Sequence, residues 1–420
     1  MKVAVVGSGI SGLACAHYLS PDHEVWVYEA ASKIGGHTAT VDVSLGTRRY
    51  AVDTGFIVFN DWTYPNFIAL MDELKVPSKP TAMGFSVRDP ATGLEYAGAN
   101  LDTLFAQRKN LLSLPFLKML KDILRFNRNA IDDLDNGRLI EGETLAAYLK
   151  RNRYGEDFAR QYLVPMGAAI WSADCNTIQD FPAVFFLRFF RNHGLLSVKN
   201  RPQWRVIEGG SREYLAPLCA RFADRIRTGN AVVKIQRNTG RGVNLVFADG
   251  SQEQFDQVVM ACHSDQALAM LDEPSPAERD ILGAIPYQPN DVVLHTDTAM
   301  LPRNRKTWSS WNYTLGKNDR PAVVTYNMNI LQGIDAPETF CVTLNDTASI
   351  NPHKILGRFT YDHPVFSLEG TAAQERWSQI NGVANTWFCG AYWRNGFHED
   401  GVVSALWVAE ALGARVQVAA

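Results

Sequence analysis

Residues 3–20 read VAVVGSGISGLACAHYLS, and this stretch decides the fold. Its apolar start predicts a buried strand, and the apolar run after the glycines predicts a helix. Between them, Gly7, Gly9 and Gly12 have G-x-G-x-x-G spacing. The first glycine permits a tight turn, the second lets the backbone approach a pyrophosphate, and the third lets the helix pack closely on the strand. The stretch therefore predicts an α/β fold that binds a dinucleotide.

A second predicted strand, EVWVYEA, follows the helix and strengthens this interpretation. It contains Glu29, about 20 residues after Gly7, where an acidic side chain accepts hydrogen bonds from ribose hydroxyls. The free N–H groups and the dipole at the start of the helix favour phosphates. The alternative is a glycine-rich turn in an α/β domain that binds no ligand.

The size, charge and cysteine content of the chain indicate which classes of protein to expect. The chain has 420 residues, of which 46% are hydrophobic, so we expect a large core and more than one domain. A formal net charge of -3 argues against a nucleic-acid partner. Six cysteines without a C-x-x-C pair favour a reduced, intracellular protein, and no motif predicts a metal site. Because a strand is predicted from Lys2, we expect no signal peptide, and no apolar run is long enough to predict a span of a bilayer.

The segment AASKIGGHT, which follows Glu29, carries a further signal. Together with the opening stretch it resembles the amino-terminal signature of the flavin amine oxidase and phytoene desaturase superfamily. The resemblance implies a glutathione-reductase-like, FAD-binding Rossmann domain. Lys33 and His37 stand where that signature usually has arginines. Lys33 keeps the positive charge without the bidentate fork, and we expect His37 to meet a phosphate or the flavin ring.

The carboxy-terminal stretch WFCGAYWRNGFHEDGVVSALWVAEAL resembles the second flavin motif of the same superfamily. We expect a strand into Gly390, a loop, and a helix from near Gly401. In the superfamily this helix points its amino terminus at the pyrimidine edge of the flavin, where the reduced flavin carries negative charge. The resemblance assigns the amides of Gly401, Val402 and Val403 to that edge. Asp400 is expected to meet the edge or to cap the helix.

Two middle segments complete the predicted FAD site. DTGFIVFN resembles the segment that lies along the flavin, and the strands from NAVVKIQ to VVMA resemble those near the adenine. Cys389 precedes Gly390 on a predicted strand with its side chain in the core, so we expect FAD to bind without a covalent link. The predicted cofactor-binding residues are Gly7, Ser8, Gly9, Ile10, Ser11, Gly12, Glu29, Ala30, Lys33, Gly35, Gly36, His37, Thr38, Thr54, Gly55, Phe56, Val233, Ala261, Gly390, Gly401, Val402 and Val403.

The order of these motifs predicts two domains, each made of separate pieces. Residues 1–75, 202–290 and 378–420 form the predicted FAD-binding domain. Residues 76–201 and 291–377 form a predicted mixed α+β domain that binds substrate and docks on a membrane. Only one dinucleotide fingerprint is present, so the substrate rather than NADPH is expected to supply the electrons. This favours an oxidase or desaturase, while a non-redox use of reduced flavin, as in sugar-ring mutases, stays open.

The segment NLLSLPFLKMLKDILRFNRNA, residues 110–130, is both apolar and basic in a mildly acidic chain. Its apolar residues recur at helical spacing, with Lys118 and Lys121 on the other side. The ordinary reading is a core-packing helix with a solvated face. A second segment, FPAVFFLRFFRNHGLL, residues 181–196, repeats the mixture. If both lie on one surface, they predict an apolar patch with a basic rim on an anionic membrane.

Within the superfamily, CGAYWRNGFHEDGV and DTGFIVFN most resemble bacterial FAD-dependent proteins associated with cyclopropane-fatty-acyl synthases, including methyl-branched fatty acyl desaturases. The resemblance implies desaturation of a phospholipid acyl chain by hydride transfer to flavin N5. It places the protein in the cytoplasm, peripherally on the inner face of the cell membrane. A cyclopropane-fatty-acyl-synthase-like methyltransferase is a further expected partner. The candidate catalytic bases are His398, Glu399 and Tyr392, which otherwise shape the loop or wall the pocket.

Two other functions remain open. In an amine oxidase, aromatic rings flank the amine, and Tyr392 or Trp393 would supply one wall. However, the sequence shows no acidic selector for an amine, and a basic entrance would repel cations. The protein could instead be a non-catalytic, flavin-bearing partner of a lipid methyltransferase.

Overall fold

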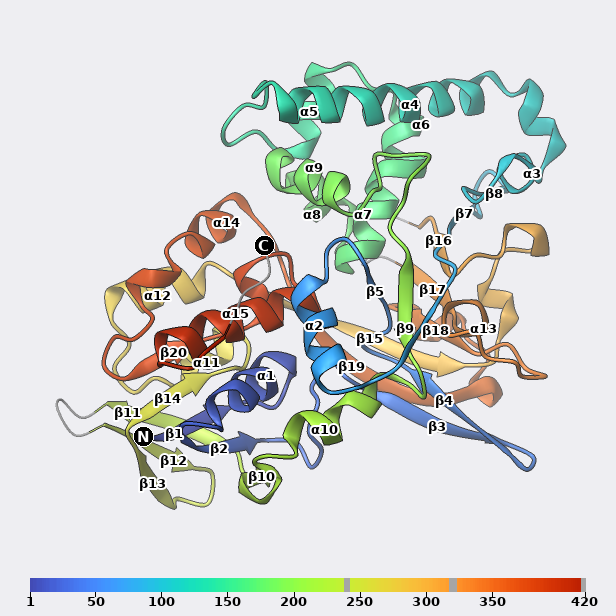
Figure 1. The fold of residues 1–420 in the computed structure, drawn as a ribbon. Helices are drawn as coiled ribbons and strands as arrows, with labels where there is room; N and C mark the ends of the chain where they lie inside the picture. Colours follow the sequence, from blue (N-terminus) through green and yellow to red (C-terminus); the bar gives the residue numbers. More distant parts are fainter. Residues whose placement is uncertain (238–241, 317–322, 417–420) are drawn as a thin grey trace.

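The computed structural model describes the whole chain except residues 238–241, 317–322 and 417–420, which fall within three of the predicted domain pieces. The described chain contains a parallel sheet, a larger mixed sheet, and a group of helices at the end of the molecule away from the parallel sheet (Figure 1). The predicted α/β class with a second, mixed α+β region is confirmed. The exact domain boundaries stay a prediction, and β15 (Tyr287–His295) crosses the one predicted at residue 290.

The parallel sheet has five strands in the order β10-β2-β1-β14-β20. Its strands are β10 (Ile226–Thr228), β2 (Glu24–Glu29), β1 (Lys2–Val6), β14 (Gln257–Met260) and β20 (Thr386–Phe388). β1 and β14 are almost wholly apolar and buried, as expected for central strands covered on both faces. Helices α1 (Ile10–Leu19) and α15 (His398–Ala411) pack against each other beside this sheet. Helices from near both ends of the chain therefore pack together beside this sheet.

A small antiparallel sheet lies next to this unit. It consists of β11 (Val232–Arg237), β12 (Val243–Phe247) and β13 (Gln252–Phe255). The Asp249-Gly250 pair makes the turn between the last two strands, and the backbone of Gly250 has a φ of +84°. This confirms the short strands expected after NAVVKIQ.

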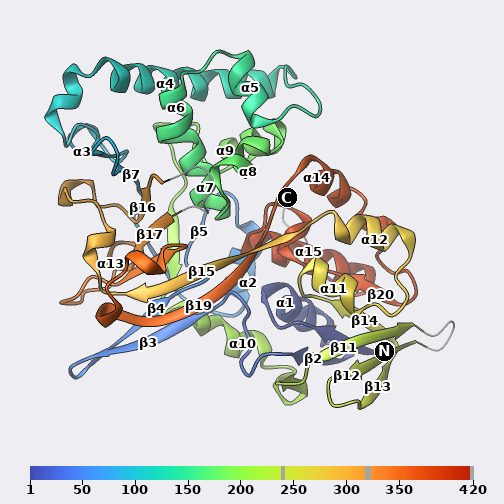
Figure 2. The ribbon, with the colours of Figure 1, turned by 180° about the vertical axis from the view of Figure 1, so that it is seen from behind.

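The mixed sheet has seven strands, antiparallel except where β16 pairs with β7. Its order is β19 (Ile355–Pro364), β15, β18 (Cys341–Leu344), β17 (Val323–Asn327), β16 (Trp311–Thr314), β7 (Phe85–Asp89) and β8 (Leu94–Ala97). In Figure 2 the long strands β15 and β19 run side by side, and the start of β15 and the end of β19 lie toward α12 and α14. This sheet therefore reaches across both halves of the molecule.

Helices cover the outer end of the mixed sheet. They are α3 (Leu101–Leu104), α4 (Leu114–Asp135), α5 (Leu145–Arg151), α6 (Glu156–Phe158), α7 (Val164–Trp171), α8 (Cys175–Asp180) and α9 (Ala183–Asn192). α4 begins as predicted, because the side chain of Ser113 accepts a hydrogen bond from the Phe116 N–H and Pro115 occupies the first turn. Among the described residues, no helix is long and apolar enough to cross a bilayer.

The remaining elements join these units. They are β3 (Thr40–Leu45), β4 (Arg48–Asp53), β5 (Phe59–Asn60), β6 (Ser78–Pro80), β9 (Trp204–Ile207), α2 (Pro65–Glu73), α10 (Leu215–Cys219), α11 (Ser264–Met270), α12 (Pro276–Gly283), α13 (Met328–Leu331) and α14 (Leu368–Gln374).

The two apolar, basic segments differ in how the structure uses them. In α9, Phe186, Phe189 and Phe190 are buried in the core. The expectation that this segment extends an exposed apolar patch is therefore wrong, because the phenylalanines face inward and leave Arg188 to solvent. In α4 the side chain of Phe116 is buried in the core, while several leucines of that helix are exposed.

Candidate active site

A cavity of about 810 Å³ lies between the parallel sheet and the mixed sheet with its helices. Fifteen of the predicted site residues line it: Gly7, Ser8, Gly9, Ile10, Ser11, Glu29, Ala30, Gly36, His37, Gly55, Phe56, Ala261, Gly390, Tyr392 and His398. Predicted residues that do not line it are Gly12, Lys33, Gly35, Thr38, Thr54, Val233, Glu399, Gly401, Val402 and Val403. The structure thus brings together residues from both ends and the middle of the chain.

The β1–α1 turn forms one end of this cavity, which we call the dinucleotide end. Gly7 has a φ of +107°, and a Cβ there would lie 2.8 Å from the carbonyl oxygen of Ala261. A Cβ on Gly12 would lie 2.0 Å from the carbonyl oxygen of Gly7. A Cβ on Gly9 would meet no heavy atom within 4 Å, and no side chain caps α1. The turn therefore needs two of its glycines for packing, while the third leaves room beside uncapped amides for a diphosphate.

Glu29 holds the turn in place. Its carboxylate accepts hydrogen bonds from the backbone N–H of Ser8 at 3.0 Å, from the Ser8 hydroxyl at 2.6 Å, and from the Ala31 N–H at 2.8 Å. Glu29 also lines the cavity at the end of β2. Its position fits the predicted role at a ribose.

A cluster of three histidines lies at the same end. The ring of His37 stacks against that of His363 with 5.3 Å between centroids, and His263 lies 6.4 Å away. Burial and the neighbouring histidines lower the pKa of His37 to about 3 and that of His363 to about 4. The Nε2 atom of His37 is buried and has no hydrogen-bond partner in the described part of the chain. Such an orphaned polar atom fits a site completed by a polar ligand.

The segment before His37 contacts the β1–α1 turn. Gly35 has a φ of +120°, and its N–H donates to the carbonyl of Ser8 at 3.0 Å. Lys33 is exposed and does not line the cavity. The prediction that Lys33 binds the cofactor is not supported, because its side chain extends into solvent beyond the turn.

His398, the first residue of α15, faces the cavity in a neutral state. Its Nε2 lies 3.2 Å from the hydroxyl of Thr38 and 3.1 Å from that of Tyr214, and the two hydroxyls also contact each other. Its ring stacks on Phe56 with 3.6 Å between centroids. Burial lowers the pKa of His398 well below its usual value. Tyr214 is thus a site residue that sequence patterns alone did not identify.

Glu399 points away from the cavity, contrary to its predicted role as a base. Its carboxylate accepts hydrogen bonds from the N–H of Asn66 at 3.1 Å, the Asn66 side chain at 2.7 Å, and the N–H of Phe67 at 2.8 Å. These groups belong to the first turn of α2. Burial raises the pKa of Glu399. The side chain therefore anchors α2 against α15, and we regard it as a positioning residue.

Tyr392 keeps its predicted place at the wall of the cavity. Its hydroxyl is buried and has no hydrogen-bond partner among the residues described. Burial raises the pKa of Tyr392 well above 10. A Cβ on Gly390 would lie 2.2 Å from the Tyr392 ring, which explains the glycine at the end of β20. Trp393, the other aromatic candidate, does not line the cavity.

The start of α15 packs tightly against α1. A Cβ on Gly401 would lie 2.8 Å from both the Ile10 and the Ser11 side chains, and Val402 and Val403 are buried. None of these three α15 residues lines the cavity, so their assignment to the flavin edge is not supported. Gly401 instead lets α15 approach α1 closely. Asp400 accepts a hydrogen bond from the Phe397 N–H at 2.9 Å, which confirms the capping alternative.

Two other predicted cofactor residues lie away from the cavity for local reasons, and one prediction about a cysteine holds. Val232 lines the cavity and Val233 is 49% exposed, because side chains alternate along a strand and the register of β11 shifts at this point. Thr54 bonds the Tyr361 hydroxyl at 2.9 Å instead of facing the cavity. Cys389 is fully buried beside Cys15 in the core, as expected.

The opposite side of the cavity is apolar, and we call it the distal wall. Its members are Met83, Phe85, Tyr162, Met166, Ile170, Trp171, Phe189, Leu195, Trp204, Trp311, Tyr326 and Leu331, with Ser172, His193 and Arg201 as polar members. The two carboxylates among the described lining residues are Glu29 and Asp362, and Asp362 neighbours the histidine cluster at the dinucleotide end. Sequence patterns gave no sign of this wall beyond its aromatic composition.

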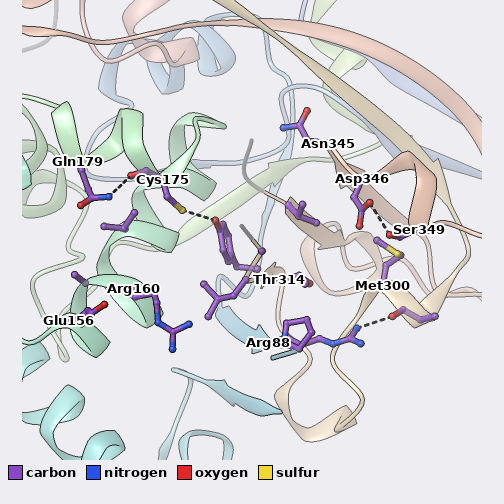
Figure 3. Close-up of a pocket in the computed structure, with 18 residues that line it drawn as sticks. Arg88, Glu156, Arg160, Cys175, Gln179, Met300, Thr314, Asn345, Asp346 and Ser349 are labelled. Carbon is purple, nitrogen blue, oxygen red and sulfur yellow. Dashed lines mark hydrogen bonds between the residues drawn. The ribbon is translucent and has the colours of Figure 1, made fainter. Parts of the chain in front are cut away.

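Figure 3 shows a second pocket, of about 520 Å³, which shares no lining residue with the first among those described. Arg88 donates to the Ala299 carbonyl there at 3.0 Å, and the Cys175 thiol lies 3.4 Å from the Tyr313 hydroxyl. None of the predicted site residues lines this pocket.

Comparisons with known proteins identify the class to which this fold and site belong. A family model described as flavin containing amine oxidoreductase matches residues 10–326, and the chain belongs to that family. A Mycobacterium tuberculosis (strain CDC 1551 / Oshkosh) protein named as a flavin-containing monoamine oxidase, AofH, is 26% identical over 296 residues. That match covers 66% of this chain and 60% of the relative, so the chain spans about 60% of its curated relative's length.

Solved structures share the fold. A putrescine oxidase double mutant with redesigned cofactor binding gives a TM-score of 0.70 at 14% identity, covering 99% of both chains. Cyclohexylamine oxidase from Brevibacterium oxydans IH-35A gives 0.69 at 17%, covering 98% of this chain and 99% of that one. A fatty acid isomerase from P. acnes that produces CLA gives 0.69 at 16%, covering 98% and 97%. At these identities the likeness shows the fold.

The chain therefore carries the fold of a family of flavin-containing oxidoreductases, which confirms the predicted enzyme class and cofactor. The dinucleotide end fits FAD, because an open glycine, uncapped helix amides, a carboxylate and an orphaned histidine nitrogen converge on it. Membership of the subgroup associated with cyclopropane-fatty-acyl synthases stays a prediction.

Proposed function

We infer that the protein dehydrogenates an apolar lipid substrate, a fatty acyl chain of a phospholipid. The observation that supports this most is the composition of the distal wall. Aromatic and aliphatic side chains predominate there, and none of the described residues of this wall carries a carboxylate. Each methylene of an acyl chain that leaves water for such a wall contributes about 0.8 kcal/mol. An extended acyl chain would thus find many favourable contacts.

The distribution of charge argues against a cationic substrate at this wall. A protonated amine needs an anionic partner when it is buried, because burying an unpaired charge is costly. Glu29 is engaged with the β1–α1 turn, and Asp362 lies near His263. The charged member of the described distal wall is Arg201, a cation. The local potential therefore favours a neutral chain.

FAD held at the dinucleotide end would supply the hydride acceptor, and the residues of the chain would position the substrate against it. The distal wall holds the acyl chain and excludes water. Tyr392 is a neutral phenol at neutral pH, because burial raises its pKa well above 10, so it acts as a hydrogen-bond donor. His398 lines the cavity and is neutral, which leaves it as the remaining predicted candidate to take the second proton, and its lowered pKa makes it a weak base.

Oxidation of an amine is the second candidate, favoured by the named activity of the M. tuberculosis relative. Of the two aromatic residues expected beside the amine, Tyr392 lines the cavity and Trp393 does not. A non-catalytic role as the flavin-bearing partner of a lipid methyltransferase is a third proposal.

The test is the visible flavin spectrum of the purified holoprotein without oxygen. Vesicles with unsaturated and methyl-branched acyl chains should bleach the oxidised band, and mass spectrometry should then find a product two hydrogens lighter. Putrescine and cyclohexylamine should leave the band unchanged. Bleaching by the amines alone would replace the lipid proposal with the amine oxidase. No bleaching by either class, together with a stable complex with the methyltransferase, would support the scaffold role.

A further inference from the structure

One end of the molecule carries leucines that face solvent. Figure 1 shows α3 and α4 at the end away from the parallel sheet, and Figure 2 agrees. Leu112 is 89% exposed and Leu124 is 61% exposed. Grouped exposure of large apolar side chains marks a contact surface. We call the following residues the leucine surface: Leu101, Leu111, Leu112, Leu114, Leu117 and Leu124.

The outer face of α4 is basic as well as apolar. Lys118, Lys121 and Arg128 are exposed on the same turns as the leucines of the helix. Over the described ranges, no carboxylate pairs with any of these three cations. The acid between them, Asp122, is engaged with Arg125 at 3.0 Å. The prediction that the cations lie opposite the apolar side is thus corrected: leucines and cations share the outer face.

This mixture fits a lipid surface better than another protein copy. Leucines on an interfacial helix enter the acyl boundary, while lysine and arginine beside them meet anionic headgroups. Two copies joined symmetrically through this face would bring Lys118, Lys121 and Arg128 of one copy toward the same cations of the other. On the 22-residue helix α4 this face runs from Leu114 to Arg128.

We propose that the leucine surface, with Lys118, Lys121 and Arg128, docks the protein on an anionic phospholipid bilayer. The biological purpose of this docking rests on the proposed function, since docking would bring the protein to a phospholipid substrate. α4 packs on α9, and α9 contributes Phe189 to the distal wall. The docked helix therefore lies one helix layer from the substrate wall.

Flotation of the holoprotein with vesicles tests the charged component. Vesicles of phosphatidylcholine with 30% phosphatidylglycerol are compared with pure phosphatidylcholine at low and high salt. Since each cation near the surface contributes about fivefold, the triple variant Lys118→Gln, Lys121→Gln, Arg128→Gln should lower partitioning into anionic vesicles roughly a hundredfold. The control Arg48→Gln, Arg49→Gln removes two exposed cations from the β3–β4 hairpin and should change it little.

The apolar component needs its own variants. Leu112→Asn with Leu114→Asn should also lower partitioning, and this loss should persist at high salt. The control Leu356→Asn changes a leucine that is 41% exposed on β19 and should bind like the wild type. The flavin spectrum of every variant shows that the protein is folded and loaded.

Three outcomes would overturn the docking proposal: no wild-type binding to anionic vesicles, equal binding to neutral ones, or equal loss in the controls. A leucine-dependent dimer in sedimentation without lipid would also overturn it in favour of a second copy. Substrate dispersed in detergent separates this test from the proposed function. Docking variants should still be reduced by dispersed lipid, whereas vesicle binding without any reduction by lipid would refute the dehydrogenase and leave docking intact.

Discussion

The Nε2 atom of His398 lies 3.1 Å from the hydroxyl of Tyr214, in a part of the structure where both side chains are buried. This contact joins the first residue of α15 to the segment before α10, and it fixes the orientation of a ring that lines the cavity. The Thr38 hydroxyl completes the group.

Replacing Tyr214 with Phe should loosen this group. The loss of one buried hydrogen bond should lower the free energy of unfolding by about 1–2 kcal/mol. The flavin reduction rate should fall as the His398 ring gains freedom, and the flavin spectrum should shift. Urea unfolding and anaerobic stopped-flow measurements check the two effects. Unchanged kinetics would show that Tyr214 only stabilises the core.

The glycines of the β1–α1 turn should respond differently to the same substitution. Gly12→Ala should prevent stable folding, because its Cβ would stand 2.0 Å from a backbone oxygen. Gly9→Ala should fold but release FAD more readily, because its Cβ would enter the room beside the uncapped amides. Circular dichroism and flavin retention on dilution separate the two results. Normal retention in Gly9→Ala would place the diphosphate elsewhere.

Glu399 and His398 are neighbours that should differ in kinetics. Glu399→Gln should lower stability by about 1–3 kcal/mol, because the new amide N–H groups face the donors of α2. It should leave the rate of flavin reduction within about twofold, whereas loss of a true base costs roughly 10²–10⁴. His398→Asn is the matched comparison and should show the large loss. A large rate loss in Glu399→Gln that the His398 variant lacks would reverse these roles.

Acid should destabilise the protein through the histidine cluster. Burial lowers the pKa of His37 to about 3 and that of His363 to about 4, so the unfolded chain binds more protons than the folded one between about pH 4 and 6.5. The stability that these groups contribute is complete above pH 6.5 and is lost as the pH falls. From pH 7 to 5, one such histidine accounts for about 2 kcal/mol.

Urea unfolding at both pH values checks this pH effect. The variant His363→Asn should show a smaller decrease in stability between pH 7 and pH 5 than the wild type. His353→Asn, which alters an exposed histidine, is the control and should behave like the wild type. An equal decrease in all three proteins would exclude His363 as the source.

The sequence was most informative where backbone geometry dictates residue type. Gly7 and Gly12 predict the turn because no other side chain fits there, and Glu29 follows at the distance set by a strand, a helix and a second strand. Motifs therefore located the dinucleotide end. Orientation was harder to predict, because His398 and Glu399 are adjacent on a helix and point to different partners. Only the fold shows that Asn66 forms a hydrogen bond with Glu399 and so turns it away from the cavity.

The distal wall was beyond sequence reasoning for a different reason. Its residues come from strands and helices far apart in the chain, and large apolar residues at such spacings usually form an ordinary core. In α9 the same pattern that suggested a surface patch proved to bury Phe189 at the cavity. Whether an apolar residue faces a core, a cavity or solvent depends on which elements pack against it.

Asp53, at the end of β4, and Gln332, beside α13, exchange two hydrogen bonds inside the protein. The Asp53 N–H donates to the Gln332 side chain at 2.9 Å, and the Gln332 amide returns a bond to the carboxylate at 2.8 Å. The same carboxylate also accepts from Ser211 at 2.9 Å. These bonds tie β4 to the segment that contains α13, and they resist hinge-like opening at this junction. With this junction held, a substrate has to fit the cavity in its present shape, so that shape becomes a filter that acts before any chemistry begins.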